Sequence, residues 1–396
     1  MDRSCIVPTF DLARVRAALP ALRECTYLNT GTFGLVAEPV AERALAALRA
    51  FDTRGMAAHE QALAWQEEAR ARVATLLNCR PEEVALTGNA TDGVNLVAFG
   101  LAWKPGDEVL ISDQEHPAMN VPWYTLARRM GVRVRHFRIA RDGDPAATLE
   151  QVAANVTAHT RLIGTSHVSH QTGVRVPARE ICAFARERGI LSLIDGAQAA
   201  GVLPIDVQAL GCDFYTSNGH KWLCSPKGIG FFYGRLELID QMEPAYVGAG
   251  STSYDPARLG EMALVSGAKR FEYGSRGHAL YAGLTAAIDY LEAMGWQAIW
   301  AHQREVAAYL KQRVLERGWR LHTPLDWEHA GGLNAFSLPG VTDVETLYHH
   351  LINEYRIYVQ RIEVFQALRV STAYFTANED IDRLFEALDR YTRRRG

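Results

Sequence analysis

The sequence describes a globular protein of 396 residues, of which 48% are hydrophobic and 22% are charged. A chain of that length can bury a large core and is expected to divide into two domains. The formal net charge of -3 comes without any long basic run, which excludes a nucleic-acid-binding protein that relies on a basic surface and leaves small-molecule partners open. No run approaches the roughly 20 apolar residues of a membrane-spanning helix, so we expect no membrane partner.

The N-terminal segment and the cysteines bear on the compartment. Residues 1–12 lack the basic start and the apolar core of a secretory signal. The six cysteines are scattered singly, without a CxxC pair, so we expect neither a zinc site nor a disulfide framework. A reduced, cytoplasmic compartment, with no bound metal, is the simplest interpretation.

The pattern of hydrophobic residues predicts an α/β fold. An opening helix is expected around residues 12–22, and short apolar runs then alternate with helical stretches over residues 82–234. This alternation is typical of a largely parallel sheet covered by helices. One crossover helix is expected over residues 177–188, because its apolar residues have helical spacing and Gly189 follows as a stop.

The pattern changes beyond about residue 277. Long helical patterns are followed by the short strands NAFSLPG and ALRVSTAYF, and by a last helix from about residue 379. This pattern of long helices and short strands predicts a smaller α+β domain that packs against the large α/β domain. We therefore place a large α/β domain at residues 21–265 and a small domain at residues 1–20 plus 266–396.

A lysine in the segment SNGHKWL is the first candidate for chemistry. Lys221 lies in a glycine-bounded loop beside His220 and Trp222, just before a predicted strand. A lysine forms Schiff bases readily when its ammonium group is partly desolvated and its pKa falls. Because a lysine beside a turn is more often an exposed surface charge, this interpretation depends on the segments upstream.

A carboxylate ends one of the predicted strands. In ILSLIDGAQ the strand runs into Asp195, at the C-terminal edge of a parallel sheet, where open α/β proteins bind ligands. A buried carboxylate there needs a partner, and a protonated pyridine nitrogen is one such partner. The alternative role for Asp195 is that of a helix N-cap.

Two further segments reach the same edge of the sheet. The run TGNATDG places backbone N–H groups and the Thr91 hydroxyl at a helix N-terminus, which is a site for anions. His116 follows the strand EVLIS, where an imidazole could stack on a planar heterocycle. Each motif alone is weak, since many glycine turns bind no ligand and most single histidines are structural.

Together and in this order, TGNATDG, EH, DGAQ and GHKW resemble the class V aminotransferases. These are pyridoxal 5′-phosphate (PLP) enzymes of fold type I, and they include cysteine desulfurases, cystine lyases and isopenicillin N epimerase. The resemblance runs from YLNTGTFG at residues 27–34 to RVSTAYFTANEDIDRL at residues 369–384. It implies PLP as the cofactor, a mostly parallel seven-stranded sheet in the large domain, and a homodimer with shared active sites.

The resemblance also implies a role for each site residue. Lys221 would hold PLP as a Schiff base, Asp195 would pair with the pyridine nitrogen and Gln198 would meet the ring hydroxyl. His116 would stack on the ring, and Arg369 would bind the substrate carboxylate together with Asn29. The residues implied near the phosphate are Ala90, Thr91, Asn218, His220 and, from the neighbouring subunit, Ser275.

Two positions depart from the family pattern. Asn218 stands where relatives usually have Ser or Thr, three residues before the lysine, so its contact with the phosphate is open. His170 stands in the loop SHVSHQTG where many relatives have Asn, and it could touch the cofactor or the substrate. The aromatic-rich segment 354–365 would either line or gate the pocket, or pack in the core or at the dimer interface.

The reaction itself is less determined. In PLP enzymes the freed lysine removes the α-proton of the amino acid and an α-carbanion forms. The sequence has no cysteine from residue 331 to 369, where cysteine desulfurases carry their mobile thiol, and Cys224 is expected to be too constrained to replace it. We favour β-elimination with cleavage of a C–S bond in a cysteine-like substrate, and epimerisation of the isopenicillin N epimerase type or transamination stays open.

Two other classes of protein fit less well. A dinucleotide oxidoreductase would need a GxGxxG fingerprint at its first helix, which the sequence lacks. A non-catalytic binding module on the same fold would be expected to have lost Lys221 or Asp195, and both are present. The sequence therefore favours an enzyme.

Overall fold

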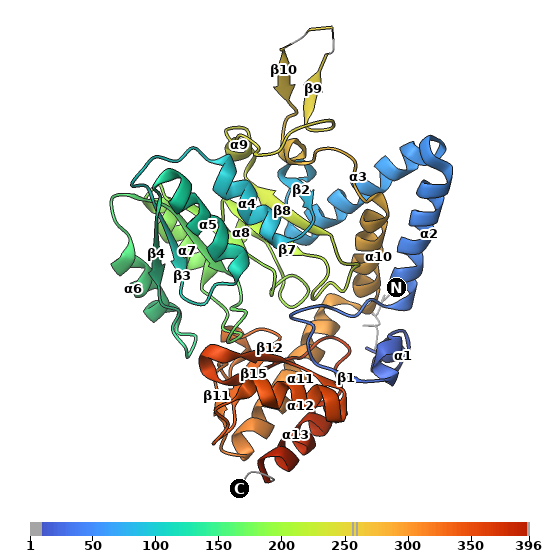
Figure 1. The fold of residues 1–396 in the computed structure, drawn as a ribbon, viewed down its shortest axis with the longest axis vertical. Coiled ribbons are helices and arrows are strands. Elements are labelled where there is room, and N and C mark those ends of the chain that lie inside the picture. The colour runs from blue at the N-terminus through green and yellow to red at the C-terminus, as the bar shows by residue number, and fades with distance from the viewer. Residues whose placement is uncertain (1–9, 256, 259, 394–396) are drawn as a thin grey trace, which may run out of the picture.

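A seven-stranded sheet forms the centre of the computed structural model, which describes residues 10–255, 257–258 and 260–393 (Figure 1). Its strands lie in the order β2-β8-β7-β6-β5-β3-β4, and only β8 runs antiparallel to its neighbours. The predicted α/β fold with a mostly parallel sheet is thereby confirmed. The strands are β2 (Val84–Thr87), β3 (Glu108–Ser112), β4 (Arg133–Phe137), β5 (Thr160–Ser166), β6 (Leu191–Asp195), β7 (Phe214–Asn218) and β8 (Gly230–Gly234).

Helices cover both faces of this sheet because successive strand residues point to opposite sides. Val109 and Ile111 pack in one core cluster with Trp123, whereas Leu110, between them, packs in another with Ile181. The helices that connect the strands are α4 (Ala90–Gly100), α5 (Pro117–Met130), α6 (Pro145–Asn155), α7 (Ala178–Glu187) and α8 (Val207–Leu210), and α9 (Leu236–Ile239) follows β8. Helix α7 confirms the crossover helix expected at residues 177–188.

The start of α5 illustrates how local sequence places a site residue. Pro117 occupies the first helical position, where its missing N–H costs no hydrogen bond. His116 precedes it as the N-cap, and its side chain accepts a hydrogen bond from the backbone of Ala118. Gly131 ends the helix with a positive φ of 72°, which glycine adopts without strain. The imidazole is thus fixed at the C-terminal edge of the sheet.

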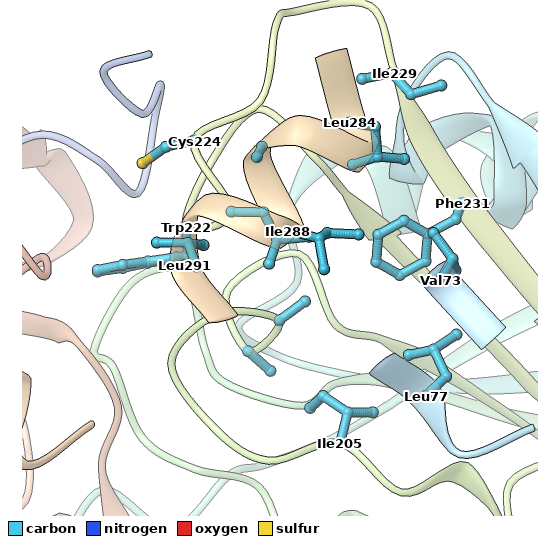
Figure 2. Close-up of a cluster of buried hydrophobic side chains, with 14 of the residues drawn as sticks. Val73, Leu77, Ile205, Trp222, Cys224, Ile229, Phe231, Leu284, Ile288 and Leu291 are labelled. Atoms are coloured by element: carbon cyan, nitrogen blue, oxygen red, sulfur yellow. The ribbon is translucent and has the colours of Figure 1, made fainter. Parts of the chain in front are cut away.

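Three long helices form a separate layer: α2 (Glu38–Arg54), α3 (His59–Leu77) and α10 (His278–Met294). Helix α10 packs against both α2 and α3. Figure 2 shows Leu284 and Ile288 of α10 facing Val73 of α3 and Phe231 of β8, within one buried cluster that also includes Trp222. This cluster anchors the loop that follows Lys221.

The C-terminal region forms a second unit around a four-stranded antiparallel sheet in the order β11-β12-β15-β14. Its aromatic core contains Trp319, Phe336 and Phe385, whose rings are stacked. Its elements are α11 (Trp296–Glu316), β11 (Arg320–Leu321), β12 (Leu333–Ser337), α12 (Val344–Tyr355), β13 (Ile357–Tyr358), β14 (Gln360–Ile362), β15 (Ala367–Ser371) and α13 (Asn378–Arg393).

The N-terminal segment lies against this second unit. Arg16 of α1 (Leu12–Ala17) forms an ion pair with Asp380 of α13, and the short strand β1 (Thr26–Tyr27) pairs with β13. The domain bounds at residues 20 and 265 stay a prediction, because α10 lies beyond residue 265 and packs with helices of the large domain.

A hairpin of β9 (Thr252–Tyr254) and β10 (Met262–Leu264) projects from the body of the protein (Figure 1). None of the helices within the described residues is long and apolar enough to cross a membrane. Short 3-10 helices lie at Pro20–Arg23, Gly55–Ala58, Pro81–Glu83, Ala268–Phe271, Trp327–His329 and Glu363–Phe365.

Candidate active site

A cavity of about 800 Å³ lies at the C-terminal edge of the large sheet. Its wall combines the ends of β6 and β7, the N-termini of α4 and α5, and residues 31–33 and 360–364. The structure brings together most of the predicted site residues here: Ala90, Thr91, His116, His170, Asp195, Gln198, Asn218, His220, Lys221 and Arg369. Asn29 and Ser275 do not line this cavity.

Lys221 has the electrostatic environment that Schiff-base chemistry requires. The pKa of its ammonium group is lowered to about 8, chiefly by burial and to a smaller extent by the positive charge of Arg369. The carboxylate of Asp195 acts in the opposite direction, because it stabilises the protonated form. About a tenth of Lys221 is therefore neutral and nucleophilic at pH 7, far more than for a lysine with the ordinary pKa of 10.5.

This pKa predicts how the apoenzyme takes up PLP. We expect the rate of covalent binding to rise with pH and to level off above about pH 8, because only the neutral amine attacks the aldehyde carbon. Absorbance of the Schiff base, followed over a series of pH values, measures this rate. A rate still rising near the ordinary lysine pKa of 10.5 would show that Lys221 is not desolvated in solution.

Asp195 is a buried carboxylate with one oxygen engaged by the backbone. Its Oδ1 accepts a hydrogen bond from the N–H of Ala197 at 2.8 Å. No helix begins there, so the contact is a local turn and not the helix N-cap considered from sequence. Burial raises the pKa of Asp195, whereas the charge of Lys221 lowers it. A protonated ring nitrogen would supply the close cationic partner that this carboxylate lacks among the described side chains.

Two histidines in the cavity are neutral and have assigned tautomers. His116 Nδ1 accepts from the N–H of Ala118, so its proton lies on Nε2, whereas His170 Nδ1 donates to the carbonyl of Gln114 at 3.1 Å. Their rings meet edge to face, with centroids 5.1 Å apart. Burial lowers the pKa of His116 to about 4 and that of His170 well below 6.5. His170 therefore retains an unprotonated Nε2 as a hydrogen-bond acceptor.

The helix end at α4 offers a place for a phosphate. Asn218 Oδ1 accepts the N–H of Ala90 at 2.8 Å, which occupies that amide and leaves the side-chain NH₂ of Asn218 to donate. The Nδ1 atom of His220 is buried and has no hydrogen-bond partner among the described residues, and a phosphate oxygen would supply one. The N-terminus of α4 at Thr91 adds favourable electrostatics for an anion. The contact of Ala90 with a phosphate stays a prediction, because Asn218 would have to release its amide.

Arg369 is a buried cation without an anionic partner in the described chain. It donates from Nη1 to the carbonyl of His170 at 2.7 Å and from Nη2 to the Thr32 hydroxyl at 3.0 Å, while its Nε has no partner. Burial lowers the pKa of Arg369 to about 10. A carboxylate bound here would restore the lost solvation, so the site fits an amino-acid substrate.

Some predicted residues lie outside the cavity, and some contacts were not foreseen. Asn29 contacts the site indirectly, through Thr32. Its Oδ1 accepts a hydrogen bond from the Thr32 hydroxyl, and that hydroxyl in turn accepts one from Arg369. Thr32 itself was missed, because nothing in its local sequence indicates a contact with a residue 337 positions away. Ser275 is exposed, and its contact with a neighbouring subunit stays a prediction. Segment 354–365 does line the cavity, through residues 360–364.

A buried carboxyl group next to His116 was also missed. Glu115 accepts hydrogen bonds from the hydroxyls of Ser112 and Ser166 and from the backbone N–H of Ser166. Burial raises the pKa of Glu115 to about 7. Because Ser112 ends β3 and Ser166 ends β5, Glu115 ties two strand ends together beside the cavity.

The cavity wall contains no cysteine among the described residues. The cysteine nearest to Lys221 in the sequence is Cys224, whose buried thiol contacts the carbonyl oxygen of Lys221 at 3.3 Å. Burial raises the pKa of Cys224 to about 12. A buried thiol that stays protonated is a poor nucleophile, so Cys224 does not have the properties of a mobile sulfur carrier.

Known proteins resemble this chain over nearly its whole length. The family model for class V aminotransferases matches residues 43–384. An isopenicillin N epimerase of Streptomyces clavuligerus is 36% identical over 92% of this chain and 94% of its own. A cysteine desulfurase of Dickeya dadantii is 35% identical over 83% of this chain and 81% of its own.

Solved structures give the same family. The cystine C–S lyase C-DES, in complex with its product cysteine persulfide, has a TM-score of 0.86 and 29% identity, covering 93% of this chain and 98% of C-DES. Another structure of C-DES holds glycine covalently linked to its PLP cofactor. The cysteine desulfurase CsdA of Escherichia coli has a TM-score of 0.84 and 29% identity, covering 96% of this chain and 98% of its own. The chain therefore belongs to the class V aminotransferase family of PLP-dependent enzymes of fold type I, which act on amino acids.

Proposed function

We propose that this enzyme is a PLP-dependent lyase that cleaves the C–S bond of a cysteine-like amino acid by β-elimination. The observation that carries the proposal is the composition of the cavity: a lysine with a lowered pKa and an unpaired buried arginine, without a described cysteine. Elimination needs a base and a leaving group but no sulfur-carrying thiol. The similarity to the lyase C-DES supports the same assignment.

The residues of the chain would divide the work as follows. Bound PLP supplies an electron sink for the negative charge that develops at the α-carbon. Arg369 binds the carboxylate of the amino acid with its guanidinium group, oriented by Thr32 and the carbonyl of His170. Lys221, once released from the cofactor, takes the α-proton. Asp195 keeps the ring nitrogen protonated through its negative charge.

The products follow from the balance of the reaction. Removal of the α-proton places an electron pair on the α-carbon, and this pair forms a double bond as the C–S bond breaks. The sulfur leaves with that bond's electron pair and takes up a proton. Hydrolysis of the remaining three-carbon fragment gives pyruvate and ammonia. No oxidant or reductant is consumed.

Epimerisation is the second candidate, because two neutral imidazoles share the cavity with Lys221. It requires that a proton be returned to the face of the α-carbon opposite to the one from which it was taken. The free Nε2 of His170 could take up a proton and return it from the imidazolium form, whereas His116 would first have to be protonated on Nδ1. The identity of 36% and 34% to two isopenicillin N epimerases supports this alternative.

One incubation separates these reactions. The holoenzyme is mixed with L-cystine, L-cysteine and longer amino acids in D₂O, and pyruvate, sulfide or persulfide, oxo acids and the configuration of recovered substrate are measured. Pyruvate with a sulfur product supports the lyase. Deuterium at the α-carbon of inverted substrate, without pyruvate, would replace it with an epimerase, and an oxo acid of unchanged carbon length would indicate transamination.

Replacing Arg369 with alanine is expected chiefly to weaken amino-acid binding. A hydrogen bond to a charged group is worth about 1.5–3 kcal/mol, so KM should rise at least about tenfold, with a smaller change in kcat. Steady-state kinetics measure both constants. Arg361→Ala is the matched control, because Arg361 also lines the cavity but is already ion-paired with Glu345. An equal rise in KM for both variants would remove Arg369 from the carboxylate site.

A further inference from the structure

Gln198 lies in the cavity wall with both ends of its side-chain amide engaged. Its Oε1 accepts a hydrogen bond from the indole N–H of Trp222 at 2.8 Å, and its Nε2 donates to the carbonyl of Gly31 at 2.9 Å. An indole N–H can only donate, and a backbone carbonyl can only accept. The amide of Gln198 is therefore held in one of its two possible orientations.

This orientation determines what Gln198 offers to a ligand. The amide nitrogen carries two hydrogens, of which Gly31 takes one. The other is left for the cavity, so Gln198 presents a donor and selects an acceptor, such as an anionic oxygen on a planar ring. If the amide turned over, its carbonyl would face the same position and would select a protonated hydroxyl instead.

Trp222 is well placed to prevent this rotation of the Gln198 amide. Its side chain is only 1% exposed and belongs to the buried cluster of Figure 2, beside Ile288 and Leu291. The indole also rests on Gly332, where an added Cβ would come within 2.7 Å of it. Because Trp222 directly follows Lys221, the group that orients Gln198 is fixed to the same loop as the lysine that binds the cofactor.

The contacts continue from Gln198 towards the substrate site. The N–H of Gly31 donates to the Ser371 hydroxyl at 3.0 Å, and an added Cβ on Gly31 would come within 2.6 Å of Leu333. Gly31 is thus held between Gln198 and β15. The next residue is Thr32, whose hydroxyl accepts from Arg369. Three hydrogen bonds and the peptide link between Gly31 and Thr32 thus connect Trp222, in the cofactor loop, with the carboxylate-binding arginine.

We propose that Trp222 is a positioning residue. Its indole N–H fixes the amide of Gln198 so that an N–H group faces the cofactor's ring oxygen, and through Gly31 it holds Thr32 against Arg369. The role does not depend on whether the reaction is elimination, epimerisation or transamination. It selects the form of bound PLP whose ring oxygen is deprotonated.

The test is the absorption spectrum of holoenzyme carrying Trp222→Phe. PLP should stay linked to Lys221, but the ratio of the longer-wavelength to the shorter-wavelength band should fall about two- to tenfold, the equivalent of the ~0.5–1.5 kcal/mol of one hydrogen bond. KM for amino acids should rise by a similar factor. Trp103→Phe is the matched control, since that buried indole donates to the carbonyl of Ala98 away from the cavity, and its spectrum should not change.

A double-mutant cycle makes the result specific. Gln198→Ala should change the band ratio in the same direction, and the double variant with Trp222→Phe should add little to Gln198→Ala alone, because both act through one amide. Fully additive effects, or a wild-type spectrum in Trp222→Phe, would overturn the proposal. If the phenylalanine variant does not fold, site-specific replacement of Trp222 with benzothienylalanine keeps the two fused rings and removes only the N–H. A wild-type spectrum in that protein would overturn the proposal equally.

Discussion

Replacing Lys221 with alanine is expected to abolish the covalent link to PLP and to reduce turnover by about 10²- to 10⁴-fold or more, the range for losing a general base alone. The variant loses both the amine that forms the Schiff base and the base that takes the α-proton. Borohydride reduction of the wild-type holoenzyme, followed by peptide mass analysis, should place the cofactor on Lys221. The same treatment of Lys221→Ala should leave no cofactor attached.

Lys311 provides the matched control for this experiment. It is also buried, and burial lowers its pKa to about 8, but its Nζ donates to the carbonyls of Pro324 and Leu325 outside the cavity. Lys311→Met should therefore keep the cofactor link and most of the activity, even if its stability falls. Reduced cofactor found on Lys311 in the wild-type protein, or retained by Lys221→Ala, would contradict the assignment.

The elements of the large domain were predictable because their signals are local. Strand β3 coincides with the apolar run EVLIS, and α7 lies within residues 177–188 as expected. Buried parallel strands are continuous apolar runs, and the helices between them have a clear amphipathic period and glycine stops. The same locality explains why motifs at strand ends, such as Asp195 and Lys221, could be assigned to one edge of the sheet.

The parts that were missed depend on contacts between distant segments. Arg369 meets His170 across 199 residues and Thr32 across 337, and Gln198 meets Gly31 across 167. No period or motif in the sequence encodes such a pairing, because it is set by how the C-terminal unit and the N-terminal segment close over the cavity. The resemblance placed Asn29 at the substrate, whereas Thr32, three residues later, is the residue whose hydroxyl contacts Arg369.

The tautomers of the histidines and the orientation of Gln198 are a further step beyond sequence. The tautomers are determined by single backbone groups, the carbonyl of Gln114 and the N–H of Ala118. The orientation of Gln198 is determined by the indole N–H of Trp222 and the carbonyl of Gly31. The family resemblance placed His116, His170 and Gln198 near the cofactor but could not say which atom of each carries a proton. The chemistry open to the site depends on those protons.

Replacing Asp195 with asparagine is expected to slow turnover while allowing covalent uptake of PLP at a lower pH. Turnover should fall about 10²- to 10³-fold, the range for losing one pre-organised electrostatic contact, because the ring nitrogen loses the charge that keeps it protonated. The pKa of Lys221 should fall below about 8, because Asp195 raises it in the wild-type protein. Covalent uptake of PLP by the apoenzyme should therefore reach its plateau at a lower pH than in the wild type, although the product enzyme is slower.

Asp213→Asn separates this effect from the general cost of removing a buried carboxylate. Asp213 is buried, accepts a hydrogen bond from the N–H of Ser192 and forms an ion pair with Arg235. It precedes β7 and therefore lies at the end of the sheet away from the cavity. That variant should lose stability without changing the pH of cofactor uptake. Near-normal turnover in Asp195→Asn would show that another group holds the ring nitrogen. An unchanged plateau pH would show that the charges of Asp195 and Lys221 are not coupled, and that the pKa of the lysine is set without Asp195, by burial and the charge of Arg369.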